Sequence, residues 1–309
     1  MSKPFPLVFI VGPTAVGKSE LALKAAQKFS GAIVNFDSLQ FFSDLNIGTA
    51  KPTVEERSAL PHFLFDICSV GENYTAGDFR KAALKVIEDQ EYNFPLFFVG
   101  GSGFYLQALE KGMFEVSDIS PEIIEETKNE QNQKGLSYLY EMLIKQDPDY
   151  AKKIEAQDSY RIFRAITLMR QLNKSMTQIN KEFQLQQQTK KLNKVIFKVG
   201  LKMDRQRLRN RVQIRTDKML ELGLIEEVED LLKIAPVNWS PLSSVGYKEV
   251  ISYLKGEYNR TQMREWIITH TMQLAKRQMT WFQRDKEVEW FESTSEALNF
   301  LGKHLTSES

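Results

Sequence analysis

The sequence predicts an α/β fold in which helices flank a sheet of parallel strands and an all-helical segment interrupts the chain. Short apolar runs, Leu7–Val11 and Pro95–Val99 among them, alternate with helical patterns, as repeated strand–helix units require. A glycine-rich loop follows each of these two runs. From Ser120 to about Gln188 the chain has no strand-like run, and one returns only at Val195–Leu201.

The same pattern predicts the domain boundaries. We expect an α/β core formed by residues 1–112 and 194–309, into which residues 113–193 are inserted as three to five helices. Ser120 before Pro121 is a typical helix start, and Gln184–Asn193 is interpreted as a polar linker back to the core. Further strands are predicted at 31–36, 63–67 and 287–291, and further helices at about 75–90, 104–109, 205–222 and 269–282.

Composition and charge narrow the class of protein. With 42% hydrophobic and 26% charged residues, the 309-residue chain is typical of a globular protein that builds its own core. The apolar run near the N-terminus is too short for a signal peptide or membrane span, so we expect a cytoplasmic protein with no membrane partner. The single Cys68 excludes a disulfide framework, and with three histidines beside it any metal is expected to be oxygen-ligated Mg²⁺. The net charge of +1 means that nucleic-acid binding would need local basic patches.

Gly12–Ser19 reads GPTAVGKS and lies between a predicted strand and a predicted helix. The pattern G-x-x-x-x-G-K-[ST] in this setting is typical of a phosphate-binding loop. Its glycines let the backbone wrap an anion, so that amide hydrogens and the positive end of the helix dipole point at phosphate oxygens. Lys18 would reach the terminal phosphates, and the Ser19 hydroxyl would coordinate Mg²⁺. The alternative is a glycine turn that only connects strand and helix.

Polar segments that follow other predicted strands would lie near this loop. Asp37 comes directly after the strand at 31–36, and ligand-binding groups of such sheets collect past the carboxyl ends of strands. Asp37 or Ser38 would, in the alternative interpretation, cap the next turn. Gly100–Gly103 either admits a ligand closely or forms a tight turn. We interpret His62, beside another strand, as a packed or turn-bonded histidine rather than a catalytic one.

Basic residues are concentrated in two segments. Arg207, Arg211 and Arg215 are spaced i, i+4, i+8 and share one face of a predicted helix. Such a face is either solvated or, beside a phosphate site, a clamp for a diphosphate, because the guanidinium binds oxyanions with a planar fork. Tyr160–Arg164 interleaves aromatic and basic side chains as nucleic-acid contacts do. An ordinary amphipathic helix with a buried apolar face explains the same residues.

Taken together, the motifs resemble those of the bacterial-type tRNA dimethylallyltransferases, also called tRNA isopentenyltransferases. They occur in that family's order and spacing from about residue 7 to residue 291, and the first three in combination are very specific. The motifs are GPTAVGKS at Gly12–Ser19, DSLQ at Asp37–Gln40, IGTAKP at Ile47–Pro52, GGSGFY at Gly100–Tyr105, SVGYKE at Ser244–Glu249 and LAKRQMTWF at Leu274–Phe282. The resemblance implies a P-loop NTPase-like core, with an inserted helical domain that contacts tRNA.

The resemblance also implies a reaction and its residues. Enzymes of this family transfer a dimethylallyl group from dimethylallyl diphosphate to N6 of adenosine 37, next to the anticodon in tRNA, which gives N6-isopentenyladenosine. Asp37 would be the general base, while Ser19 through Mg²⁺ and Arg215 would stabilise the diphosphate leaving group. The diphosphate site would comprise Gly12, Pro13, Thr14, Ala15, Val16, Gly17, Lys18, Ser19, Arg211 and Arg215. The tRNA site, for the anticodon stem-loop, would comprise Asp37, Ser38, Leu39, Gln40, Ser102, Tyr160, Arg161, Ile162, Phe163, Arg164, Gly246, Tyr247, Lys248, Arg277 and Gln278. We expect a monomer.

Departures from the family pattern are few. Phe42 stands where the family usually has tyrosine, which removes a hydroxyl and any hydrogen bond that it would make. Ser19 and Ser102 replace the commoner threonines and keep the hydroxyl. The chain has no Cys/His zinc extension of the kind found in eukaryotic relatives.

Three other functions share parts of this pattern. A prenyltransferase acting on free AMP, ADP or ATP would use the same loop and carboxylate, and a small-molecule P-loop kinase would bind ATP there. The helical insertion and the KRQMTWF segment favour a large RNA acceptor over a free nucleotide. The kinase is disfavoured because no apolar run ends in the acidic pair typical of many NTPases, and because Asp37 is joined by arginines from the other half of the chain. A non-catalytic RNA-binding module with a relic loop is disfavoured because Lys18, Ser19, Asp37 and Arg215 are all present.

Overall fold

The computed structural model describes residues 6–89, 94–113, 119–187, 192 and 194–305. The chain divides into two compact units, one formed by residues 1–109 and 193–309 and the other by residues 110–192. The predicted insertion had been placed at 113–193. The first four residues of the predicted linker Gln184–Asn193 belong to a helix, and positions 188–191 and 193 lie outside the described residues.

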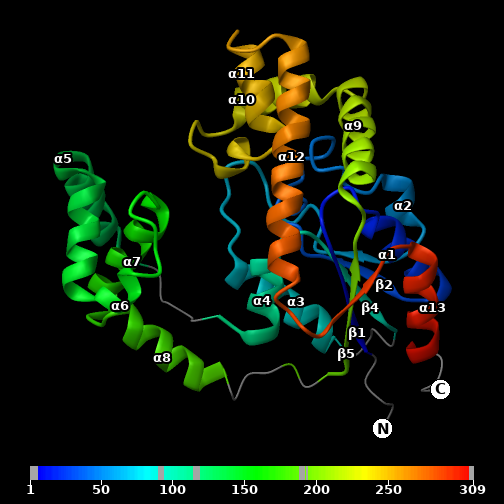
Figure 1. Ribbon diagram of the computed structural model, residues 1–309, viewed down its shortest axis with the longest axis horizontal. Helices are drawn as coiled ribbons and strands as arrows, with labels where there is room; N and C mark the ends of the chain where they lie inside the picture. The colour runs from blue at the N-terminus through cyan, green and yellow to red at the C-terminus, as the bar shows by residue number, and fades with distance from the viewer. Residues whose placement is uncertain (1–5, 90–93, 114–118, 188–191, 193, 306–309) are drawn as a thin grey trace. The chain divides into compact units, whose positions relative to one another are not determined.

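The first unit is built on a six-stranded sheet in which all the described pairings are parallel (Figure 1). The strand order is β3-β2-β4-β1-β5-β6. The strands are β1 Leu7–Val11, β2 Ala32–Asn35, β3 His62–Phe63, β4 Leu96–Val99, β5 Ile196–Leu201 and β6 Val288–Phe291. Every residue of β1, β2 and β4 is buried, which explains why these strands read as continuous apolar runs. The sheet confirms the predicted α/β class.

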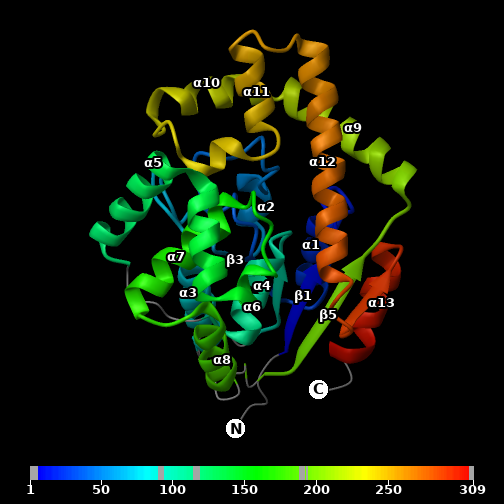
Figure 2. The same ribbon diagram turned by 60° about the vertical axis from the view of Figure 1, so that its left-hand side comes forward.

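Helices cover both faces of this sheet (Figures 1 and 2). Successive side chains of a strand point to opposite faces, so each buried strand needs apolar partners on both sides. Val8 and Ile10 of β1 belong to a core cluster shared with helices α1 and α13. Phe9 packs on the other face against Phe98, with ring centroids 5.0 Å apart. The helices at and around the sheet are α1 Lys18–Lys28, α2 Val54–Ser58, α3 Ala76–Glu88, α4 Gly103–Lys111, and α13 Thr294–Leu305.

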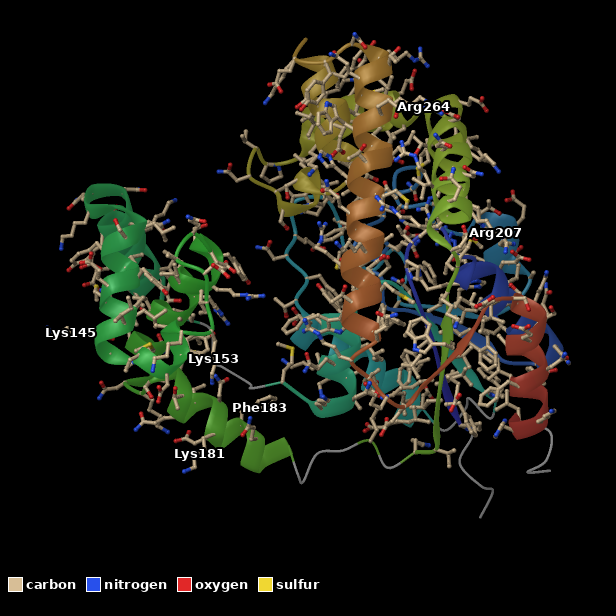
Figure 3. All side chains as sticks on the ribbon, in the orientation of Figure 1. Lys145, Lys153, Lys181, Phe183, Arg207 and Arg264 are labelled. Atoms are coloured by element: carbon tan, nitrogen blue, oxygen red, sulfur yellow. The ribbon has the colours of Figure 1, made fainter. Side chains whose placement is uncertain are left out.

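A second group of helices extends beyond the end of the sheet at which the strands finish (Figures 1 and 2). It consists of α9 Arg205–Glu221, α10 Leu224–Ile234, the 3₁₀ turn η1 Ser240–Ser243, α11 Tyr247–Leu254, and α12 Arg260–Phe282. Helix α12 packs against α9 and α11. Arg264 of α12 binds both carboxylate oxygens of Asp217 on α9, with Nε–Oδ1 at 2.5 Å and Nη2–Oδ2 at 2.8 Å (Figure 3). These helices therefore form a supported wall above the ends of the strands.

Strand β3 is shorter than the sequence predicted. The apolar run at 63–67 predicted a strand of five residues, but only His62 and Phe63 pair with β2. Leu64 and Asp66 have φ of 62° and 53°, in the left-handed region. The chain therefore turns out of the sheet after Phe63, and the prediction is wrong beyond that residue.

The second unit is helical and has its own core. Its helices among the described residues are α5 Pro121–Gln146, α6 Pro148–Ala151, α7 Ser159–Leu172 and α8 Met176–Gln187. The predicted start at Ser120–Pro121 is confirmed, and α5 contains a break at Gly135, where φ is 85°. Leu139 and Leu143 of α5 are buried with Ile162 of α7. No helix within the described residues of either unit is long and apolar enough to cross a membrane.

Candidate active site

The loop between β1 and α1 depends on two glycines with positive φ. Gly12 has φ of +139°, and a Cβ at this position would lie 2.5 Å from the carbonyl oxygen of Leu201, so no other residue fits. Gly17 has φ of +112° and forms the N-cap of α1. The first N–H groups of a helix have no acceptor within the helix. They are therefore available to an anion at the end of this loop.

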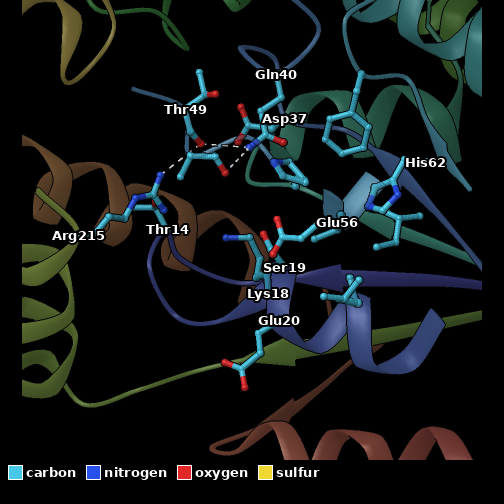
Figure 4. Close-up of a pocket in the computed structure, with 18 of the residues that line it drawn as sticks. Thr14, Lys18, Ser19, Glu20, Asp37, Gln40, Thr49, Glu56, His62 and Arg215 are labelled. Atoms are coloured by element: carbon cyan, nitrogen blue, oxygen red, sulfur yellow. Dashed lines mark hydrogen bonds between the residues drawn. The ribbon is translucent and has the colours of Figure 1, made fainter. Parts of the chain in front are cut away.

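A cavity of about 250 Å³ opens over this loop (Figure 4). Its polar wall includes Lys18, Ser19, Asp37 and Arg215, which come from α1, the segment after β2, and α9. The rest of the lining is mixed and includes the apolar residues Ala22, Leu23, Ile33, Phe65 and Val99 as well as polar residues such as Gln40 and His62. The cavity therefore offers charged groups to an anion and apolar side chains to a short tail.

Among the charged residues that line this cavity, Lys18, Arg215 and Asp37 act on one another. Lys18 Nζ donates a hydrogen bond to the carbonyl oxygen of Pro13 at 2.8 Å. Burial lowers the pKa of Lys18 to about 8, with the carboxylate of Asp37 opposing this shift and the guanidinium of Arg215 adding to it. Burial also lowers the pKa of Arg215, again against the effect of Asp37. Both cations are therefore held where their charge is costly, as expected of groups that receive an anion.

Asp37 is fixed in place by a residue that the sequence analysis did not identify. Asn35, the last residue of β2, is fully buried. Its Oδ1 accepts the N–H of Asp37 at 2.8 Å, and its Nδ2 donates to the carbonyl oxygens of Leu64 at 2.9 Å and Asp37 at 3.2 Å. Asp37 Oδ1 accepts the N–H of Leu39 at 3.1 Å. The carboxylate thus has one oriented oxygen, and Oδ2 lies on the side of Gly101.

Residues far apart in the sequence close the site over the phosphate-binding loop. Arg215 Nη1 donates to the hydroxyl of Thr14 at 3.4 Å, and its Nη2 donates to the carbonyl oxygen of Thr49 at 3.3 Å (Figure 4). Gln40 Nε2 donates to the same carbonyl oxygen at 3.1 Å. Gln278 of α12 accepts the N–H of Thr14 at 2.8 Å and donates to the carbonyl oxygen of Gly101 at 3.1 Å. Gln278, assigned to the tRNA site from sequence, thus also supports the loop.

A second cavity, of about 440 Å³, meets the first. Five residues line both: Thr14, Asp37, Thr49, Arg215 and Gln278. The second cavity continues past Ser38, Leu39, Ser102, Gly246, Lys248 and Arg277. The Ser102 hydroxyl accepts the N–H of Ser38 at 3.1 Å, which joins the two loops on this side. Ligands in the two cavities would approach each other beside Asp37.

Some residues predicted for the site do not line either cavity. Arg207 is exposed and lies near Asp204, with Nε–Oδ2 at 3.6 Å (Figure 3). Arg211 is exposed too, but a Cβ at Gly17 would lie 3.7 Å from its Nη2, so it lies beside the loop. Of the three arginines predicted to share one face of this helix, only Arg215 lines the cavities. The side chain of Tyr247 is fully buried and supports a neighbouring loop instead.

The segment Tyr160–Arg164 belongs to α7 of the second unit. Ile162 is fully buried in that unit's core and Phe163 is partly buried against it. Tyr160, Arg161 and Arg164 are exposed. The segment is thus an amphipathic helix whose outer face carries the aromatic and basic groups, and Ile162 offers no contact surface of its own.

Phe42 lies close to the site but is packed inside. It is 5% exposed, and its ring meets that of Trp239 edge-on with centroids 5.0 Å apart. Its carbonyl oxygen accepts a hydrogen bond from Lys51 Nζ at 2.7 Å. The ring at this position therefore serves packing. His62, which also lines the first cavity, bonds to the carbonyl oxygen of Leu60 at 2.9 Å and meets Phe65 edge-on, in agreement with the predicted packed histidine.

The donor set of the first cavity fits Mg²⁺. Ser19 is exposed at the start of α1, and Asp37 and Glu56 line the same cavity as carboxylates (Figure 4). The Glu20 carboxylate points away from them and pairs with Lys24 at 2.7 Å. Hydroxyl and carboxylate oxygens are hard ligands, and Mg²⁺ usually combines one or two protein ligands with oxygens of a bound phosphate. Ser19 is the residue that would hold such an ion.

Fold and site together define an α/β protein with two adjoining cavities. The glycine-rich loop after β1 and an arginine from the C-terminal half border the first cavity, and the second shares residues with it.

A family model described as IPP transferase matches residues 40–285. The chain is 46% identical over 290 residues to a tRNA dimethylallyltransferase of Bdellovibrio bacteriovorus, with 94% of each chain covered. It is 37% identical over 288 residues to one of Halothermothrix orenii, covering 92% of this chain and 87% of the relative.

Solved structures give the same result. The tRNA isopentenylpyrophosphate transferase of Bacillus halodurans matches with a TM-score of 0.70 and 30% identity, covering 98% of this chain and 97% of the other. A eukaryotic dimethylallyltransferase acting on tRNA matches with a TM-score of 0.79 and 25% identity, covering 99% and 77%. The chain belongs to the IPP transferase family of tRNA dimethylallyltransferases. The predicted family and its P-loop NTPase-like fold are confirmed.

Proposed function

We propose that this protein transfers a dimethylallyl group from dimethylallyl diphosphate to N6 of the adenosine next to the anticodon in tRNA. The observation that carries the proposal is the junction of the two cavities at Asp37. Asp37 lines both cavities: Lys18 and Ser19 line the first, and the second, of about 440 Å³, continues past Ser38 and Ser102. A diphosphate donor and a base would therefore meet at a group that can accept a proton.

The chemistry of the donor side is the stabilisation of a leaving group. As the bond between the prenyl carbon and oxygen breaks, negative charge grows on the diphosphate. Lys18, the N–H groups at the start of α1, and Arg215 face the place where that charge would form. Fixed donors of this kind act mainly on the transition state, and removal of one typically costs about 10²–10³-fold in kcat. Mg²⁺ bound at Ser19 would supply further neutralisation of the diphosphate.

The chemistry of the acceptor side is the removal of a proton. The adenine N6 amine is a weak nucleophile because its lone pair is delocalised into the ring. Asp37 Oδ1 is oriented by the N–H of Leu39, and the carboxylate would accept an N6 proton as the new C–N bond forms. The apolar wall of Ile33, Phe65 and Val99 would exclude water from the prenyl carbon.

Recognition of RNA would follow from the same arrangement. The target base must leave its stack to reach Asp37, so we propose that it is flipped into the second cavity. Ser38, Ser102, Lys248 and Arg277 line that cavity and offer hydroxyl, ammonium and guanidinium groups to the base and backbone. The exposed face of α7, with Tyr160, would add contacts to the anticodon stem-loop.

The direct test is a transfer assay. The protein is incubated with Mg²⁺, dimethylallyl diphosphate and an anticodon stem-loop, and the digested RNA is analysed by mass for prenylated adenosine. Parallel reactions contain AMP in place of RNA, or labelled ATP with small alcohols. Prenylated AMP or phosphorylated alcohol, without modified RNA, would reject the proposal in favour of one of the alternative enzymes.

Replacement of Asp37 by asparagine tests the role of the base. The asparagine side chain would keep an oxygen for the Leu39 N–H, so RNA and diphosphate binding should remain, while kcat falls about 10²–10⁴-fold. Asp230→Asn, an exposed carboxylate of α10 paired with Lys233, is the matched control and should retain activity. Full activity of Asp37→Asn would remove this carboxylate from the mechanism.

A further inference from the structure

Glu227 of α10 makes an unusually complete set of contacts with one loop. Its Oε2 accepts the N–H groups of Asn46 at 3.0 Å and Ile47 at 2.7 Å. Its Oε1 accepts the N–H of Gly48 at 3.0 Å and the hydroxyl of Tyr247 at 2.8 Å. Four donors therefore converge on one carboxylate, three of them from consecutive backbone positions. Glu227 is not among the residues that line either cavity, so the carboxylate acts from behind the wall.

The loop that Glu227 holds contributes a carbonyl group to the site. The carbonyl oxygen of Thr49 accepts hydrogen bonds from Arg215 at 3.3 Å and Gln40 at 3.1 Å. Thr49 lines both cavities. Its own hydroxyl is turned back to the carbonyl oxygen of Leu45 at 2.9 Å. Displacement of the loop would therefore move the acceptor that orients the Arg215 guanidinium.

Tyr247 connects the same carboxylate to the other side of the site. Its ring lies against Gly48, where an added Cβ would approach ring atoms to 2.6 Å. Tyr247 is fully buried, and burial together with the Glu227 carboxylate raises the pKa of its hydroxyl well above the ordinary value, so it stays a donor. Tyr247 also begins α11, between Gly246 and Lys248, which line the second cavity. Glu227 thus contacts the supports of both cavities.

We propose that Glu227 is the positioning residue that sets the geometry of Arg215 toward the departing diphosphate, acting through the loop Asn46–Thr49, with Tyr247 as its second anchor. This role rests on the proposed function, since it concerns the same leaving group. It differs from a general stabilising role because its effect on the leaving group is transmitted through Arg215, the charged side chain from which the Thr49 carbonyl oxygen accepts a hydrogen bond. The contribution of Glu227 should therefore disappear when Arg215 is absent.

The experiment is a double-mutant cycle between Glu227→Gln and Arg215→Ala. Glutamine keeps the shape of the side chain but turns one acceptor into a donor, so at least one of the four donors loses its partner. We expect Glu227→Gln to lower kcat about tenfold, the scale on which one unsatisfied donor acts, with little change in the KM for the RNA stem-loop. In the Arg215→Ala background the same change should cost less than about twofold, because coupled residues are not additive. Glu229→Gln, an exposed position on the same helix, is the matched control and should behave like the wild type.

A second measurement separates this inference from the proposed function. Calorimetric titration with inorganic diphosphate needs neither RNA nor prenyl transfer, and Glu227→Gln should weaken that binding only where Arg215 is present. Tyr247→Phe removes one donor to Glu227 while the ring remains against Gly48, so it should give a smaller loss of the same kind. Full losses in the Arg215→Ala background, or wild-type kcat and diphosphate binding for both variants, would overturn the inference. Absence of RNA prenylation by the wild type, with Arg215-dependent diphosphate binding intact, would instead count against the proposed function alone.

Discussion

Replacement of Asn35 by leucine would test whether a buried amide holds Asp37 in place. Leucine has the same branching at Cγ as asparagine but larger, apolar end groups, so the change removes the hydrogen bonds without leaving a cavity. The Asn35 side chain makes three hydrogen bonds, one to the N–H of Asp37 and two to the carbonyl oxygens of Leu64 and Asp37. The side chain is fully buried at the end of a central strand.

The cost follows from what each partner loses. The carbonyl oxygen of Asp37 keeps a second donor, the N–H of Gln40 at 3.2 Å, so its loss is small. The Asp37 N–H and the Leu64 carbonyl oxygen would each lose this bond inside the protein. An unsatisfied buried group costs about 1–3 kcal/mol, so we expect the loss of both bonds in Asn35→Leu to lower the free energy of unfolding by about 2–6 kcal/mol. The kcat should fall as well, because Asp37 would no longer be oriented.

Urea unfolding followed by tryptophan fluorescence measures this effect in the relevant unit. All four tryptophans, Trp239, Trp266, Trp281 and Trp290, belong to the first unit, as Asn35 does. Thr216→Val is the control: it removes one buried hydrogen bond, to the carbonyl oxygen of Val212 at 2.8 Å, and should cost less than about 1.5 kcal/mol. An Asn35→Leu protein as stable as this control, with unchanged kcat, would refute the reasoning.

Three further predictions concern the phosphate-binding loop. Gly12→Ala should weaken the binding of inorganic diphosphate at least about tenfold, because the new Cβ would lie 2.5 Å from the Leu201 carbonyl oxygen. Calorimetry measures this affinity, and an unchanged value would show that the backbone of the loop can shift to accept a Cβ. Since the pKa of Lys18 is lowered to about 8 and the cation is the form that binds, diphosphate affinity should be highest below that pH and fall as the pH rises through it. Titrations from about pH 6.5 to about pH 9.5 would show this fall in the wild type and a weaker one in Lys18→Ala, and equal slopes would exclude Lys18 as its cause. Gln278→Glu should also weaken diphosphate binding about tenfold, because it puts a negative charge beside the loop and replaces the donor to the Gly101 carbonyl oxygen; Gln283→Glu, exposed just after the same helix, is its control in the same titration.

The sequence predicted the parts of the fold that depend on local pattern. Strands β1, β2 and β4 are fully buried and therefore appear as apolar runs, and the loop at Gly12–Ser19 has a motif whose backbone requirements are strict. The length of β3 was mispredicted because its end is set by two residues in the left-handed region, Leu64 and Asp66. Leucine rarely adopts this conformation, so the turn directly after Phe63 has no signal in the sequence.

The supports of the site could not be predicted in the same way. Asn35 reads as one polar residue at the end of a strand, and Glu227 as an ordinary member of an acidic helix. Each becomes recognisable only from its partners, and those of Glu227 lie about 180 positions away in the loop at Asn46–Gly48. For the same reason the position of Arg215 followed from its resemblance to a family motif, while its contacts with Thr14 and Thr49 required the structure.

Two residues from the far end of the chain hold Thr14 of the loop after β1. Its hydroxyl accepts a hydrogen bond from Arg215, 201 positions later, and its N–H is bound by Gln278, 264 positions later. Both partners come from the helices that follow the inserted unit, and both also line the second cavity. The loop is therefore completed by the same residues that border the proposed acceptor site. Because those residues are shared, we expect a change in the second cavity to alter the proposed diphosphate site directly.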